Sequence, residues 1–147
     1  MTLEQWYEWG YVSLHKTSRE EITHLMKAAD QDIANAQVPG ISNDWRLNMA
    51  HNAILRAAAA ALAASGYRPD RQAHHYRLIE SLEKTVGLSA EYTGRLNAMR
   101  KKRNIASYEM AGVVTDKEAN EVIDAAKDIC ERVETWLHVN YPELMEK

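Results

Sequence analysis

A cluster of basic side chains between residues 92 and 108 is the part of the sequence best suited to chemistry. This window contains five arginines and lysines and no acid, although the whole chain has a net charge of −3. Cations that no acid offsets within their own segment favour anionic ligands such as phosphate. We therefore expect any anion-binding site to lie here. Its candidate phosphate-binding residues are Arg95, Arg100, Lys101 and Lys102.

The end of this window has the spacing of one helical surface. Arg100, Asn104 and Tyr108 recur every four residues and would form one polar stripe, while Arg103 belongs to the neighbouring stripe. Apolar positions flank Arg103 at helical spacing, which places its guanidinium at the edge of a bundle. There it needs a carboxylate, a carbonyl or a phosphate as a partner, and Glu109 or an acid of the last helix could serve. The pattern leaves open both a structural or dimer-interface role and a phosphate-binding role.

Other combinations of reactive residues are weaker. Glu21-x-x-His24 is a lone motif, whereas ferritin-like di-iron bundles need two, so we expect a solvated helix face and no metal. His74 and His75 are adjacent and would point about 100° apart on a helix, which prevents a shared metal and exposes at least one of them. Cys130 has the spacing of an apolar helix face and is expected in the core. Glycine-rich phosphate loops do not occur, so we expect no cofactor.

The composition indicates an all-α protein. Alanine, leucine, glutamate, lysine and arginine are common, β-branched residues are few, and six glycines and three prolines leave little turn chemistry for many short strands. The longest apolar run, residues 57–64, is far shorter than the roughly 20 residues that cross a bilayer. The first residues lack the basic and apolar segments of a secretory signal, so we expect a cytoplasmic protein with no membrane contact.

Capping and stop signals divide the chain into helices. Ser18-x-x-Glu21 and Thr115-x-x-Glu118 have the spacing of capping boxes. We expect a short N-terminal helix and longer helices over residues 18–37, 42–65, 70–86, 89–110 and 115–142. The predicted fold is an up-and-down four-helix bundle with additional short helices. It forms a single domain over residues 1–147, with the short helix and a connection at 1–17 and the bundle core at 18–142.

The Arg103-Asn104 pair and the alanine-rich segment at residues 50–66 carry a family resemblance. With the pair His74-His75, these segments resemble the HEPN superfamily of small helical bundles, and one branch of it especially, over about residues 42–138. The HEPN signature is an arginine, often followed by asparagine, and then a histidine after four to six intervening residues. Arg103-Asn104 matches its start, and Tyr108 stands where the histidine is expected.

The resemblance implies a homodimer whose signature helices meet at a two-fold axis. In active members the paired arginine and histidine form a metal-independent endoribonuclease site, often in a toxin–antitoxin or phage-defence pair. Here Arg103 would stabilise the phosphorane, Asn104 would orient the phosphate and Tyr108 would exchange a proton. A tyrosine, with a pKa near 10, is a poor base at neutral pH unless the surrounding cations lower that value. Alternatively, the ring of Tyr108 packs and its hydroxyl bonds to Asn104 or Arg100.

Two functional hypotheses stay open from the sequence. In the first, a dimeric HEPN-like protein binds RNA or another phosphate-bearing ligand between Arg100 and Tyr108. If it is an enzyme, it is a metal-independent endoribonuclease of a toxin–antitoxin or phage-defence system, with an antitoxin as partner. In the second, the same residues are dimer scaffold, and the protein is a non-catalytic interaction module for a nucleotidyltransferase-like or other protein. Substituting Arg103 would abolish RNA binding under the first and mainly disturb assembly under the second.

Overall fold

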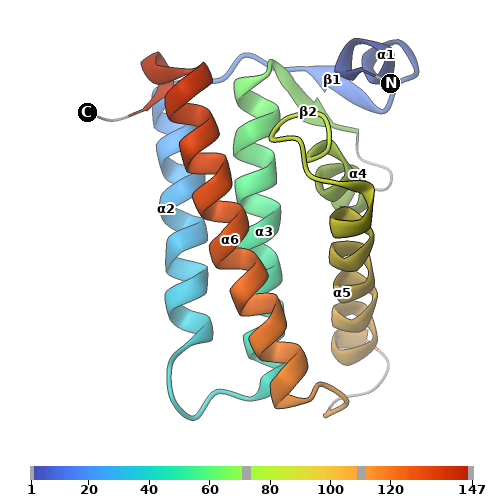
Figure 1. Ribbon diagram of the computed structural model, residues 1–147, viewed down its shortest axis with the longest axis vertical. Helices are drawn as coiled ribbons and strands as arrows, with labels where there is room; N and C mark the ends of the chain where they lie inside the picture. Colours follow the sequence, from blue (N-terminus) through green and yellow to red (C-terminus); the bar gives the residue numbers. More distant parts are fainter. Residues whose placement is uncertain (1, 71–73, 109–111, 146–147) are drawn as a thin grey trace.

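Four long helices form the body of the protein (Figure 1). The computed structural model describes residues 2–70, 74–108 and 112–145, and at 106–108 the backbone only. The long helices are α2 (Arg19–Ala36), α3 (Asn43–Ala64), α5 (Ala90–Tyr108) and α6 (Asp116–Asn140). Helix α3 is central, since it packs against α2, α6 and α5. The predicted all-α bundle is therefore confirmed.

The central position of α3 follows from its small side chains. Alanines fill most of residues 57–64, and all of them but Ala59 are buried. Small side chains let neighbouring helices approach closely, so α2 and α6 pack along the whole of this helix. Cys130 on α6 is also buried, as predicted, and burial raises the pKa of its thiol to about 12. Trp45, which the sequence places among the apolar positions of α3, is instead 60% exposed.

The helix starts are set by the expected caps, with one difference. The hydroxyls of Ser18, Ser42 and Thr115 each accept a hydrogen bond from the backbone N–H three residues on. At Thr115 the full capping box forms. At Ser18 it does not, because the Glu21 carboxylate instead accepts hydrogen bonds from Thr17 at 2.6 Å and pairs with His15 at 2.7 Å. Those two partners also lower the pKa of Glu21 against the opposing effect of burial.

The helix predicted over residues 70–86 is shorter than expected. Helix α4 spans His74–Ser81, and residues 82–86 form tight turns in place of further α-helix. The buried hydroxyl of Ser81 bonds to the carbonyl of Leu78 at 2.6 Å, and the N–H of Leu88 bonds back to the carbonyl of Leu82 at 3.1 Å. This turn buries both Leu82 and Leu88, which a continuous straight helix would separate. Tertiary burial therefore outweighs helical periodicity here.

The N-terminal region caps one end of the bundle (Figure 1). The predicted short helix is present as α1 (Leu3–Glu8). Two short strands, β1 (Val12–Leu14) and β2 (Tyr67–Pro69), pair antiparallel and were not predicted. A short 3-10 helix, η1 (Pro142–Leu144), follows α6. No helix in the described part of the chain is long and apolar enough to cross a membrane.

Candidate phosphate-binding site

The basic residues of α5 divide between two sides of that helix. Arg100 and Arg103 lie toward α3 and α4, where Arg103 contacts Asn52 of α3 and Arg100 lies by Tyr76 of α4. Arg95 and Lys102 line a groove that α5 forms with α6. Lys101, the fifth basic residue, is exposed. The single cationic cluster of the sequence is thus two different sites in space.

Arg103 is half-buried and incompletely paired. One terminal nitrogen, Nη2, donates to Oδ1 of Asn52 at 3.4 Å, which is a long hydrogen bond. Its Nε is buried and has no hydrogen-bond partner among the described side chains. None of the carboxylates in the described residues pairs with it, although the predicted partner Glu109 lies outside those residues. A partly desolvated guanidinium of this kind favours an anion.

His51 of α3 lies beside this arginine and is completely buried. Neither ring nitrogen has a hydrogen-bond partner. Burial lowers the pKa of His51 to about 3, and the charges of Arg103, His75 and Arg100 add to the effect. The imidazole is therefore neutral at physiological pH, and it adds no second charge to the interior.

His75 of α4 belongs to the same group. It is half-buried, while its neighbour His74 is exposed, as predicted for at least one of the pair. The two rings meet edge to face with centroids 5.4 Å apart. Burial lowers the pKa of His75, as do the charges of Arg103, His74 and Arg100. The same two arginines of α5 therefore lower the pKa of a histidine on α3 and of another on α4.

An open cavity of about 490 Å³ gives solvent access to His75 and to Arg100. It is lined by His74, His75, Tyr76 and Arg100. The guanidinium carbon of Arg100 lies 6.0 Å from the centre of the Tyr76 ring, and its Nε donates to Asn97 at 3.3 Å. The cavity thus presents a cation, imidazoles and an aromatic ring together. We call His51, Asn52, His75, Arg100 and Arg103 the arginine–histidine cluster.

The other two catalytic candidates lie on the same helix. Asn104 is half-buried on α5. Tyr108 is the last residue of α5, and its side chain lies outside the described residues. The backbone places it about one turn beyond Asn104 and close in sequence to Arg103. Its predicted role as a proton donor or acceptor stays a prediction.

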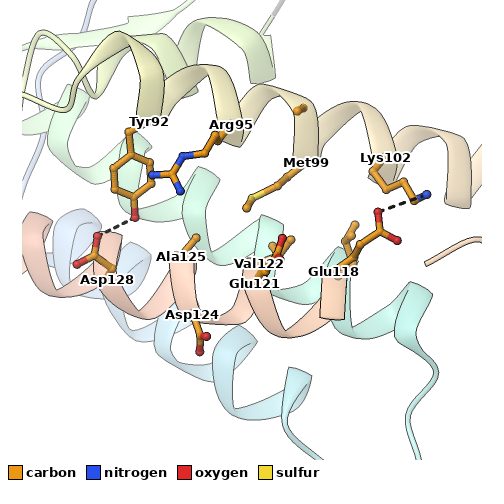
Figure 2. Close-up of a pocket in the computed structure, with 12 residues that line it drawn as sticks. Tyr92, Arg95, Met99, Lys102, Glu118, Glu121, Val122, Asp124, Ala125 and Asp128 are labelled. Carbon is orange, nitrogen blue, oxygen red and sulfur yellow. Dashed lines mark hydrogen bonds and ion pairs between the residues drawn. The ribbon is translucent and has the colours of Figure 1, made fainter. Parts of the chain in front are cut away.

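On its other side, α5 faces α6 across a groove of about 770 Å³ (Figure 2). Lys102 pairs with Glu118 of α6 at 3.4 Å, and the Tyr92 hydroxyl donates to Asp128 at 2.7 Å. Burial, with that hydrogen bond and the charge of Asp128, raises the pKa of Tyr92 to about 12. The guanidinium of Arg95 lies 4.9 Å from the centre of the Tyr92 ring. Figure 2 shows the basic side chains on one wall and the carboxylates on the other.

The two sides therefore differ in the charge that faces α5. Helix α6 contributes Glu118, Glu121, Asp124 and Asp128 to the groove, which offset its cations. The side toward α3 and α4 has arginines beside neutral histidines and an amide. Within the described residues, no three histidine, cysteine or acidic side chains gather so that they could hold a metal ion. The better anion site is the arginine–histidine cluster.

A comparison with protein families matches most of the chain. The HEPN domain model matches residues 17–136, which contain α2, α3, α5, most of α6 and the arginine–histidine cluster. The chain belongs to the HEPN domain family. No curated protein matched the sequence. Membership in the HEPN family is consistent with a nuclease-like, RNA-binding or interaction role.

Sequence reasoning did not foresee the roles of His51 and His75. His51 lies at helical spacing from Leu47 and Ile54, both of which are buried, so it is a polar residue on a core face. An isolated polar residue on a face of buried apolar positions could therefore have been identified from the sequence. His75 carried a similar signal, because it lies at helical spacing from Leu78, Ile79 and Leu82, which are buried.

Proposed function

We propose that this HEPN protein binds RNA by its phosphates at the arginine–histidine cluster and is a divergent metal-independent endoribonuclease. The observation that carries the proposal is Arg103, a half-buried guanidinium that, within the described residues, has no partner at Nε and meets an amide in place of a carboxylate. A homodimer, a toxin–antitoxin or phage-defence setting, an antitoxin partner and a cytoplasmic location belong to the same proposal.

Phosphate fits the chemistry of this site better than a carboxylate-bearing side chain does. A phosphate diester presents two anionic oxygens, and Arg103 and Arg100 together offer several N–H donors from adjacent turns of one helix. The histidines are neutral, so they add no positive charge in the free protein, and His75, which lines the cavity, can donate one N–H. The aromatic ring of Tyr76 at the cavity offers a surface on which a base can stack.

The catalytic roles proposed for α5 are the ones that the HEPN signature suggests. Arg103 stabilises the charge that develops on the phosphorane, and Asn104 orients the phosphate from the adjacent stripe. Tyr108 exchanges a proton at the end of the helix. Arg95, Lys101 and Lys102 extend RNA binding along α5, with Lys102 doing so only when the RNA competes with Glu118.

A second candidate function is supported by exposed apolar side chains. Trp45 on α3 and Ile105 on α5 are 60% and 40% exposed. Large apolar side chains of this kind favour contact with another protein chain. In this alternative the arginine–histidine cluster is scaffold, and the protein is a non-catalytic interaction module that partners a nucleotidyltransferase-like or other protein.

Incubating the purified protein with mixed cellular RNA in chelator tests the proposal. Arg103→Ala should weaken RNA binding by about 10- to 100-fold and remove cleavage, because it deletes charged hydrogen bonds to phosphate. Lys127→Ala is the matched control, since it removes one exposed positive charge from α6. It should change binding by less than about threefold, as expected for a screened surface charge. Circular dichroism and gel filtration check that folding and oligomeric state are unchanged.

The salt dependence of RNA binding tests the same point independently. Each phosphate contact to single-stranded RNA contributes a slope of about −0.7 to log affinity against log salt. Arg100→Ala and Arg103→Ala should each reduce the magnitude of the slope by about that amount. RNA that stays intact and unbound at low salt would refute the proposal and favour the interaction module.

A further inference from the structure

We propose that His75 is a catalytic base of this site, which accepts the proton of the attacking 2′-hydroxyl while Arg100 and Arg103 hold the phosphate. The inference rests on the proposed function, because it names the proton acceptor for RNA cleavage at the arginine–histidine cluster. It assigns that role to α4, not to the signature helix α5.

The position of His75 is the first argument. It lines the open cavity together with Arg100, so a phosphate held by Arg100 lies within reach of its ring. It is half-buried, which leaves one side of the imidazole accessible from the cavity. His51 responds to the same charges but is completely buried, so it cannot touch a substrate.

The other histidines of the chain are elsewhere. His15 pairs with Glu21 at 2.7 Å beside the start of α2, and His24 is exposed on α2. His138 lies in the last turn of α6, where it faces Glu134. Of the imidazoles described, only His74 and His75 line a cavity that also contains an arginine, and His75 is the one whose pKa the charge of Arg103 lowers.

The charge state of His75 suits a base. Burial and the positive charges of Arg103, His74 and Arg100 lower its pKa, so the ring is neutral at pH 7 and has an acceptor nitrogen. A base with a pKa near or below the working pH is in its active form in most molecules. A bound phosphate offsets the arginine charges, so it stabilises the imidazolium that forms on proton transfer.

The step balances with water as the only co-reactant. His75 takes the proton of the 2′-hydroxyl, and the 2′-oxygen forms its bond to phosphorus as the bond from phosphorus to the 5′-oxygen breaks. The hydroxyl of Tyr108, in the role proposed above, or a water molecule protonates the departing 5′-oxygen, and the imidazolium returns its proton to the phenolate or hydroxide that remains. The products are a 2′,3′-cyclic phosphate and a 5′-hydroxyl end. Arg100 and Arg103 stabilise the added negative charge on the phosphorane.

His75→Asn tests the role, with His24→Asn as the matched control on exposed α2 surface. Binding is measured separately with a short 2′-O-methyl oligoribonucleotide of mixed sequence, which lacks the attacking hydroxyl. We expect His75→Asn to bind this oligonucleotide within about threefold of the wild type and to cleave mixed cellular RNA at least about 100-fold more slowly. His24→Asn should bind the oligonucleotide and cleave RNA as the wild type does.

The pH profile and the ends of the products give a readout that a structural role would not move. The kcat/KM of the wild type should fall below about pH 6.5, and the residual activity of His75→Asn should lack that fall. The new ends should be 2′,3′-cyclic phosphates. In NMR titrations, inorganic phosphate should raise the pKa of the His75 resonance, which is identified by its absence in His75→Asn.

The outcomes separate this inference from the proposed function. Cleavage by His75→Asn at the wild-type rate, or a His75 resonance that phosphate leaves unchanged, would overturn the inference. A wild type that binds the oligonucleotide but does not cleave RNA would overturn it too, while leaving RNA binding intact. Loss of oligonucleotide binding in the wild type would show that the proposed function itself is wrong.

Discussion

The two sides of α5 have basic residues of the same kind and opposite surroundings. Toward α6, Lys102 pairs with Glu118, and Arg95 lies by a tyrosine that is bonded to Asp128. Toward α3 and α4, the half-buried Arg103 meets an amide and lies beside neutral histidines. The residues that α5 contributes do not explain this contrast. The helix opposite decides it, because α6 presents acids and α3 presents alanines, His51 and Asn52.

The two sides of α5 therefore contribute differently to the stability of the folded protein. In the groove, opposite charges offset each other, so the groove side contributes modestly to stability. In the cluster, a charge and two neutral imidazoles are partly desolvated without full compensation, which costs stability in the free protein. Sites that are destabilising for the fold are often those that function requires. Three predictions test this difference, beginning with the largest effect.

Acid should destabilise the protein through His51. The pKa of His51 is about 3 in the folded protein and about 6.5 in the unfolded chain. Between these two pH values the unfolded chain binds a proton at His51 and the folded chain does not. Stability is therefore complete above pH 6.5 and falls as the pH drops toward 3. Between pH 7 and 4.5 the loss is about 2.5 kcal/mol from this residue. His75, whose pKa is also lowered, acts in the same direction.

Urea unfolding of wild type and His51→Leu across this pH range measures the effect. His51→Leu replaces a buried imidazole without hydrogen bonds by an apolar side chain of similar size, so it should be folded and at least nearly as stable at pH 7. The difference between the two proteins should widen below pH 6.5. Parallel pH curves would mean that His51 is not held neutral, and the contrast between the two sides would lose its main support.

Arg103→Met should stabilise the protein, whereas Lys102→Met should not. The first substitution removes a half-buried charge with an unpaired Nε, and relief of that desolvation is worth about 1 kcal/mol or more. The second breaks the pair with Glu118 and should cost about 0.5 kcal/mol. Thermal unfolding at pH 7 gives both values. Equal destabilisation by both variants would indicate that Arg103 has a structural partner after all.

The coupling between Lys102 and Glu118 should be the smallest effect. Each side chain is about one-third exposed, so solvent screens their attraction. A double-mutant cycle with Lys102→Met and Glu118→Gln should give a coupling of about 0.2 to 1 kcal/mol that shrinks in high salt. A coupling well above this range would show that the groove is less hydrated than its geometry indicates.

The bundle was predictable because its signals are local. Ser42 and Thr115 cap helices where expected, and the apolar spacing of α2 and α6 buries Ile22, Ala29 and Ile129 as it should. The prediction was wrong where a distant contact overrides the local pattern. At residues 82–86 the burial of two leucines ends the helix early, and β1 and β2 pair across more than fifty residues of sequence.

The candidate site was only half predictable for the same reason. Arg100 and Arg103 were predicted from the charge of their segment and from their helical spacing, and His51 was identifiable as a polar residue on a buried face. Helical periodicity puts Arg95 and Lys102, seven residues apart, on one side of α5 and Arg100 and Arg103 on another, but it does not say which helices these two sides face. That depends on how α5 is rotated against its neighbours, which is set by packing.

By itself, the sequence determined that this chain forms long capped helices around an alanine-rich helix, and that its cations gather on one of them. Those properties depend on backbone hydrogen bonding and side-chain size, which act within a few residues. Only the tertiary structure decided which cations meet carboxylates and which meet neutral histidines. That outcome depends on charge and burial between helices remote in sequence, because electrostatic effects are set by distance and desolvation in space.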